Sequence, residues 1–303
     1  MATASQIIAL TRDYSIETTP GTAAKVESFK ALLPAGTCVN VTFLPGTDYN
    51  DTVATARRLK DDGMVPVPHI AARSIPSQAA LETYLGRLHD EAGVTQALVI
   101  GGGLKKPLGV FDAAIQLLET GLFEKHGIRK IGIAGHPEGT PDIAPDEVKR
   151  HTLAKAKWAS DRGLSMYLVT QFCFEADPVM AWMKWLSDNG VTLPVRIGVP
   201  GPASIKTLLR FAQECGIGPS MRVITRQAAN IAKLLTVQTP DELMVAMAEF
   251  KANDKTGRLD GIHLYPFGGF AKTCNWFNAV KAGHFAFDRS GAGFSLVEAA
   301  VAS

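Results

Sequence analysis

The sequence lacks an excess of charge of either sign. Its 31 Lys and Arg residues nearly balance its 29 Asp and Glu residues, and the formal net charge is +2. So small a net charge gives no electrostatic reason to expect nucleic acid or an anionic membrane as a partner. No apolar run approaches the ~18 residues of a membrane-spanning helix. The start, MATASQIIALTRDYS, lacks the basic and apolar regions of a signal peptide, so we expect a cytoplasmic protein.

Cysteine is scarce, and its spacing matches no motif. The four cysteines, none in a C-x-x-C pair, are Cys38, Cys173, Cys215 and Cys274. This pattern fits reduced thiols better than a disulfide framework. Metal-binding patterns are also missing, because no H-x-x-x-H occurs and the first predicted strand has no H-x-H. We therefore expect no bound metal, and the 46% apolar composition leaves a globular enzyme as the default class.

Eight short runs rich in β-branched and apolar residues predict eight strands. They are Tyr14–Thr19, Cys38–Phe43, Val65–Ile70, Gln96–Gly101, Lys130–Gly135, Met166–Gln171, Pro194–Val199 and Gly261–Tyr265. Intervening segments with three- and four-residue apolar spacing or helix-start signals predict helices. These include Ser77–Asp90, Asp146–Arg162, a helix from Asp177, Ser204–Cys215, Met221–Val237 and Pro240–Asn253. Apolar strands alternating with helices are typical of a parallel sheet covered on both faces.

Eight such units in 303 residues predict a (β/α)₈ TIM barrel, with extra helices between the seventh and eighth strands. The alternative is an open doubly wound sheet, which normally has a glycine-rich turn after its first strand. Here that strand ends Glu17-Thr-Thr-Pro-Gly21, without G-x-G-x-x-G, which favours the barrel. No repeat, low-complexity tract or linker divides the chain, so we expect residues 1–303 to form a single domain.

Candidate functional residues stand where predicted strands end, because barrel sites lie at the carboxyl ends of the strands. Glu17 is either a general acid or a structural carboxylate in a salt bridge or cap, since an unpaired buried carboxylate is costly. His69 and His136 are either ligand contacts or, for His69 above all, hydrogen-bonded structural residues. The run Gly101–Gly103 lets a ligand or a backbone segment approach closely, or is simply a flexible turn. Lys155 and Lys157, on one predicted helix, are expected on its solvated face.

Three stretches resemble the methylenetetrahydrofolate reductase family, in the same order along the chain. Ile133-Ala-Gly-His-Pro-Glu-Gly-Thr-Pro-Asp142 is similar to the loop after strand five, "A-[AG]-Y-P-x-x-H-P-E". Leu168-Val-Thr-Gln-Phe-Cys-Phe174 is similar to "I-T-Q-x-F-F" in strand six, and Ile197-Gly-Val-Pro-Gly-Pro202 to "P-G-I-x-P" at strand seven. Weaker similarities link Ser15–Pro20 to "S-F-E-F-F-P", Val39–Thr42 to "V-S-V-T" and Pro68-His69 to "P-H-L". The resemblance runs from Ser15 to about Tyr265.

The resemblance implies a barrel with non-covalent FAD at the carboxyl ends of its strands. Family members pass a hydride from NAD(P)H to FAD and then to 5,10-methylenetetrahydrofolate, which gives 5-methyltetrahydrofolate. Glu17 matches the general acid that protonates the N10 side of the folate. The matched cofactor-binding positions are Thr42, His69, Gly101, Gly102, Gly103, Ala134, His136 and Lys157. The matched substrate-binding positions are Gln171, which holds the pterin, Ile205 and Tyr265; a homo-oligomer is left open.

Several positions depart from the family pattern. The family's R-G-D after strand four is here Gly101-Gly102-Gly103, so an Arg that reaches the cofactor and an Asp that tunes flavin and folate are missing. The other replacements are His136 for Tyr, Thr140 for His, Ile205 for the stacking Phe and Gly268-Gly269 for N-R. All of these changes touch the ligand-binding face, while the barrel frame remains.

Two alternative functions stay open, and the first follows from these departures. The loss of flavin contacts predicts a flavin-independent folate oxidoreductase or a folate-binding barrel. A metal-dependent barrel hydrolase or lyase, built on Glu17, His69 and His136, is the third hypothesis.

Overall fold

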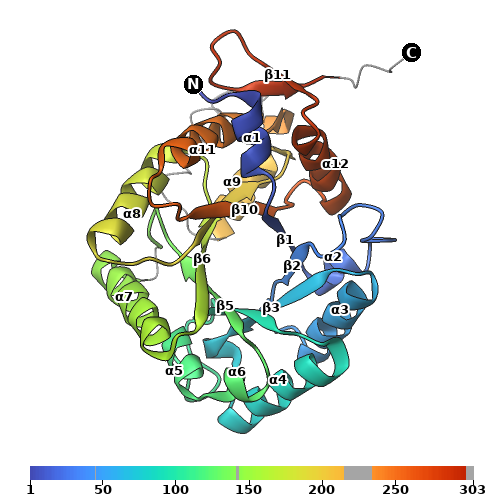
Figure 1. Ribbon diagram of the computed structural model, residues 1–303. Coiled ribbons are helices and arrows are strands. Elements are labelled where there is room, and N and C mark those ends of the chain that lie inside the picture. The colour runs from blue at the N-terminus through green and yellow to red at the C-terminus, as the bar shows by residue number, and fades with distance from the viewer. Residues whose placement is uncertain (45, 141–142, 215–233, 298–303) are drawn as a thin grey trace. The chain divides into compact units, whose positions relative to one another are not determined.

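The computed structural model describes residues 1–303 except 45, 141–142, 215–233 and 298–303 (Figure 1). Eight strands form a closed parallel barrel in the order β1-β10-β7-β6-β5-β4-β3-β2. They are β1 Tyr14–Thr18, β2 Cys38–Val41, β3 Val65–Ala71, β4 Gln96–Ile100, β5 Lys130–Gly135, β6 Ser165–Phe172, β7 Val195–Pro200 and β10 Leu259–Tyr265. The predicted barrel is therefore confirmed, and every strand boundary lies within two residues of its prediction.

The chain groups into two units, which are described separately. The β1–β5 unit comprises Ser15–Gly135 and Lys149–Val169. The β7–β10 unit comprises Met1–Tyr14, His136–Val148 and Thr170–Ser303.

In the β1–β5 unit, helices α3 and α4 show how the sequence encodes the layer outside the strands. The Asp48 side chain caps α3 (Tyr49–Asp61), which packs against β2, β3 and α4 (Figure 1). The Ser77 hydroxyl caps α4 (Gln78–Ala92), and Gly93 ends it at a φ of 57°, a left-handed conformation that glycine adopts readily. The buried face of α4 includes Leu81, Tyr84, Leu85 and Leu88, as the apolar spacing predicts. The other helices are α2 Pro20–Ala23, η1 Ala72–Ser74, α5 Ala114–Glu119, α6 Leu122–Lys125 and most of α7, Pro145–Arg162.

In the β7–β10 unit, two described helices lie between the seventh and eighth barrel strands. They are α9 (Ile205–Glu214) and α11 (Asp241–Asn253), which match the helices predicted over 204–215 and 240–253, and α11 is one of the two extra helices expected there. The predicted helix over 221–237 falls almost wholly outside the described residues, and Val237 belongs instead to a short strand that pairs with Ser204. That pair is β8 Ala203–Ser204 with β9 Val237–Gln238.

The same unit holds α8 (Ala176–Asp188), α1 (Ala4–Leu10) and α12 (Phe270–Lys281), and α1 packs against α11 and α12 (Figure 1). It also holds the antiparallel hairpin of β11 (Phe285–Phe287) and β12 (Phe294–Leu296). Within the described part of the chain, no helix combines the length and apolar character needed to cross a membrane.

Gly198 sets the close approach of β7 to the end of β6. Its N–H donates to the Thr170 hydroxyl at 2.8 Å, and its carbonyl accepts from the Cys173 N–H at 2.9 Å. A methyl group at residue 198 would lie 2.3 Å from the carbonyl oxygen of Gln171. Because that obstacle is backbone, it cannot swing aside as a flexible side chain would, so the approach requires glycine.

We predict that Gly198→Ala lowers the free energy of unfolding by about 1–3 kcal/mol, the usual cost of extra volume in a packed site. Gly103→Ala is the matched control, because a methyl group there would meet no atom within 4 Å. It should change stability by no more than about 0.5 kcal/mol. Urea unfolding followed by circular dichroism measures both variants, and equal stability would contradict this role for Gly198.

Candidate functional site

Glu17, Thr42 and His69 come together at the carboxyl ends of β1, β2 and β3. Strand register explains why. Glu17 pairs with Asn40 and Asn40 pairs with Val67, so residues two positions further on, Thr42 and His69, share the face of Glu17. The Thr42 hydroxyl donates a hydrogen bond to Oε1 of Glu17, and Nε2 of His69 lies 3.5 Å from the same oxygen. The structure thus joins three residues that the sequence singled out separately.

This carboxylate is buried, with polar neighbours on β2 and β3. Glu17 is 9% exposed and His69 is 6% exposed. Val67, on the face of His69, belongs to a buried cluster with Leu98, Tyr167 and Val169. Burial makes a charged carboxylate costly unless it is hydrogen-bonded, and Thr42 supplies such a bond. A buried carboxyl group beside an imidazole can act as a general acid or base.

Asn40 is a site residue that the sequence reasoning missed. It is 1% exposed and lies beside Glu17 in the sheet, and its side-chain Nδ2 has no hydrogen-bond partner among the residues described. Such orphaned donors are rare in protein interiors. The signal was present in the sequence as a single amide in the apolar strand Val39-Asn-Val.

The three residues after β4 are glycines, and the space beside two of them is open. Gly102 has a φ of +90°, and a methyl group there would lie 3.1 Å from Cβ of Ala71. At Gly101 and Gly103 a methyl group would meet no atom within 4 Å, and neither residue has a positive φ. The backbone therefore demands glycine only at the middle position.

Arg73 anchors the loop that follows these glycines. Its N–H donates to the Gly101 carbonyl at 2.9 Å, and its guanidinium donates to the Leu104 carbonyl at 3.2 Å. Its Nε also lies 3.0 Å from a carboxylate oxygen of Asp112. The guanidinium is therefore already engaged in holding the loop.

Ile205 and Tyr265 pack in one cluster of the β7–β10 unit, and Gln171 follows the strand residue that Tyr265 bonds. The Tyr265 hydroxyl donates to the carbonyl of Thr170, the residue before Gln171, at 2.8 Å. Oε1 of Gln171 is buried and has no hydrogen-bond partner among the described residues. Ile205 is buried in an apolar cluster against which Tyr265 packs. The half-buried rings of Phe211 and Phe267, which the sequence reasoning missed, belong to the same cluster.

Two more predicted cofactor contacts, Ala134 and His136, lie in β5 and directly after it. Ala134 is a half-buried residue of β5 in the β1–β5 unit. His136 is half-buried directly after β5 and belongs to the β7–β10 unit. No group of three or more metal-ligating side chains occurs in the described ranges.

The two lysines of α7 differ sharply in environment. The Lys157 amine is exposed and hydrogen-bonds both carboxylate oxygens of Asp161, at 3.0 and 2.9 Å. The predicted solvated face is wrong for Lys155, which is 8% exposed because it shares the buried face of α7 with Thr152 and Trp158. Burial lowers the pKa of Lys155 to about 8.

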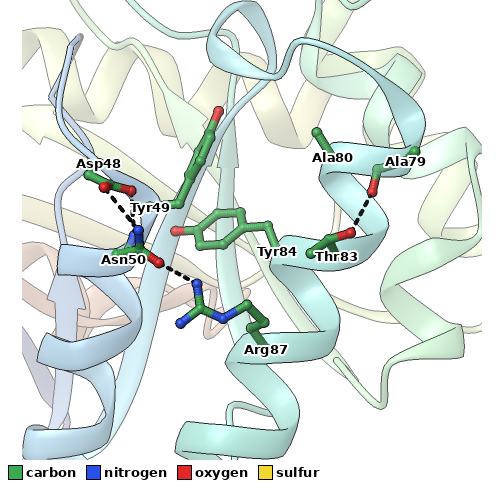
Figure 2. Close-up of a pocket in the computed structure, with 8 residues that line it drawn as sticks. All are labelled: Asp48, Tyr49, Asn50, Ala79, Ala80, Thr83, Tyr84 and Arg87. Atoms are coloured by element: carbon green, nitrogen blue, oxygen red, sulfur yellow. Dashed lines mark hydrogen bonds between the residues drawn. The ribbon is translucent and has the colours of Figure 1, made fainter.

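A pocket of about 390 Å³ lies between α3 and α4 (Figure 2). Its polar side chains largely bond one another or nearby backbone: Arg87 donates to Asn50, Asn50 donates to Asp48, and Thr83 donates to the Ala79 carbonyl. Tyr49 donates to the Ser74 carbonyl, and burial raises the pKa of Tyr49 to about 12. None of the predicted site residues lines this pocket.

The Lys155 environment predicts a pH dependence of stability. Between pH 8 and the ordinary lysine value of 10.5, the unfolded chain holds a proton that the folded chain has lost. Stability therefore rises as the pH rises through that interval. Lys155→Met should remove this rise and add on the order of 3 kcal/mol to the free energy of unfolding at pH 7.

Lys157→Met is the control on the same helix, and it should leave the pH dependence intact. Urea unfolding from pH 7 to pH 10.5 measures both variants. The same pH slope in the native chain and in Lys155→Met would contradict the assignment.

The protein is therefore a parallel α/β barrel with a buried carboxylate at the carboxyl ends of its strands. No model of a known protein family matches the chain. A stretch of 88 residues is 30% identical to methylenetetrahydrofolate reductase 1 of Schizosaccharomyces pombe, and it covers 29% of this chain but only 14% of that relative. The chain is thus distantly related to this reductase over part of its length.

The fold is shared with a solved structure. An uncharacterized protein from Clostridium thermocellum, which binds two copies of 5-methyl-5,6,7,8-tetrahydrofolic acid, has a TM-score of 0.50 and 14% identity. That alignment covers 87% of this chain and 92% of the other. A family 18 chitinase from Crocus vernus has a TM-score of 0.46 and 12% identity, over 83% of this chain and 92% of the chitinase.

Proposed function

We propose that residues 1–303 act as one catalytic domain that interconverts 5,10-methylenetetrahydrofolate and 5-methyltetrahydrofolate with NAD(P)H. The observation that carries this proposal is the buried carboxylate of Glu17, hydrogen-bonded by Thr42 and 3.5 Å from His69. The partial match to a methylenetetrahydrofolate reductase supports the same reaction. The methyltetrahydrofolate bound by the Clostridium protein supports the same class of substrate.

Glu17 serves as the general acid. Opening of the five-membered ring to the reactive iminium requires a proton on the N10 side, and a buried carboxyl group can deliver it. Thr42 fixes the carboxyl group through its hydrogen bond to Oε1. His69, next to the same oxygen, is placed to return or hold the proton.

Gln171 and Tyr265 supply the substrate contacts. The buried Oε1 of Gln171 is an acceptor with no described partner, and a pterin ring offers ring N–H and amino donors. An unsatisfied buried acceptor costs about 1–3 kcal/mol, and a bound pterin would remove that cost. The hydrogen bond from Tyr265 to Thr170 steadies the strand segment next to Gln171.

The side chains around β1–β5 do not fit FAD, the carrier that the family resemblance implies. The three glycines after β4 offer no side-chain donor, and Thr42 and His69 face Glu17. Lys157, expected near the cofactor phosphates, is bonded to Asp161. The family resemblance predicts bound FAD, but these residues do not support that prediction.

Glu17→Gln tests the proposed acid. The amide keeps the size of the side chain but cannot deliver the proton, so we expect folate turnover to fall by roughly 10²–10⁴-fold. Binding of 5-methyltetrahydrofolate should persist. Steady-state assays of 5-methyltetrahydrofolate formation and calorimetric titration measure the two quantities.

Glu27→Gln, an exposed carboxylate on the same unit, is the control and should match the native rate. Near-native turnover in Glu17→Gln would show that this carboxyl group is not the acid.

A further inference from the structure

We propose that this barrel passes hydride directly between nicotinamide and folate, without a bound flavin; this inference rests on the function proposed above. Three features of the β1–β5 unit carry it: the glycines after β4, the hydrogen bonding of Glu17, and the present contacts of Arg73 and Lys157.

At two of the three glycines after β4, the backbone would accept a residue that has a side chain. Gly101 and Gly103 have no positive φ, and a methyl group at either would meet nothing within 4 Å. The Cβ atom of an arginine or an aspartate would therefore meet no clash at these positions, and the backbone would not be strained. The segment offers a bound ring only backbone groups and open space.

Thr42 and His69 are committed to Glu17 and cannot also hold a flavin at no cost. The Thr42 hydroxyl has one proton, and Oε1 of Glu17 already accepts it. Turning that hydroxyl toward a cofactor would take a hydrogen bond from a carboxylate that is 9% exposed. Loss of a hydrogen bond to a buried polar group is unfavourable, so the acid and a flavin would compete for the same donor.

Two cations of the β1–β5 unit, Arg73 and Lys157, are engaged in other contacts. The Lys157 amine bonds Asp161 on the exposed side of α7. Arg73, which reaches the loop after β4, bonds the Leu104 carbonyl and Asp112. Recruiting either cation would break its present contacts.

The direct reaction balances without a carrier. Glu17 protonates N10 as the bond from N10 to the bridging carbon breaks, which leaves an iminium at N5. The hydride and its electron pair leave C4 of the dihydronicotinamide and form the third C–H bond of the N5-methyl group. The folate carbon is reduced and NAD(P)H is oxidised to NAD(P)⁺, with the proton on Glu17 replaced from water.

Isotope transfer tests this route in the chain of residues 1–303. NAD(P)H deuterated at C4, in either configuration, is mixed with 5,10-methylenetetrahydrofolate, and the methyl product is analysed by mass spectrometry. We expect one deuterium per methyl group from one of the two configurations, and added FAD should not change the rate. Loss of the label to water from both configurations would overturn the inference, because a reduced flavin exchanges the transferred hydrogen with solvent.

A titration of FAD gives a readout that is independent of turnover. The native chain should not quench FAD fluorescence with a stoichiometric endpoint. Gly101→Arg/Gly103→Asp introduces the Arg and Asp of the family pattern, and Gly101→Ala/Gly103→Ala is its matched control. The first variant is expected to bind FAD at least as tightly as the native chain. Stoichiometric binding by the native chain would overturn the inference. A chain with no folate turnover by either route and no FAD binding would instead refute the proposed function.

Discussion

The hydrogen bond between Thr42 and Glu17 ties the architecture of the β1–β5 unit to its chemistry. A carboxylate buried in a strand must be satisfied by neighbours, and those neighbours come from β2 and β3. Side chains alternate between the two faces of a strand, so a one-residue slip of either strand would turn Thr42 or His69 away from the carboxylate. The register of three strands is therefore a condition for keeping Glu17 inside the protein. The same bond leaves a carboxyl group held in place at a strand end, where barrel proteins carry out their reactions.

The strands of this barrel could be predicted closely from the sequence, because each is a short apolar run set off from its neighbours. Gln96–Ile100 and Lys130–Gly135 were found almost residue for residue. The short pair formed by Ser204 and Val237 could not be found, since a two-residue strand has no periodicity and depends on a distant partner. Lys155 was misassigned for a related reason: the side of a helix that a lysine occupies depends on the neighbours against which the helix packs.

The site was predictable one residue at a time but not as an arrangement. Glu17, Thr42 and His69 were each identified from strand ends, yet only the register shows that they share one carboxylate oxygen. Asn40 was missed because nothing in the sequence shows that its amide is buried without a partner. The glycines after β4 were visible as a departure, whereas the open space at Gly101 and Gly103 required coordinates. These features together favour Glu17 as the acid in a folate reaction, and they offer few side chains that could hold a flavin.

The most direct test of this account is a crystal structure of the chain with 5-methyltetrahydrofolate. We predict that the folate binds at the carboxyl ends of the strands, with its N10 about 2.6–3.2 Å from the Glu17 carboxylate or joined to it through one water. A folate bound elsewhere, or bound there with N10 turned away from Glu17, would contradict the account.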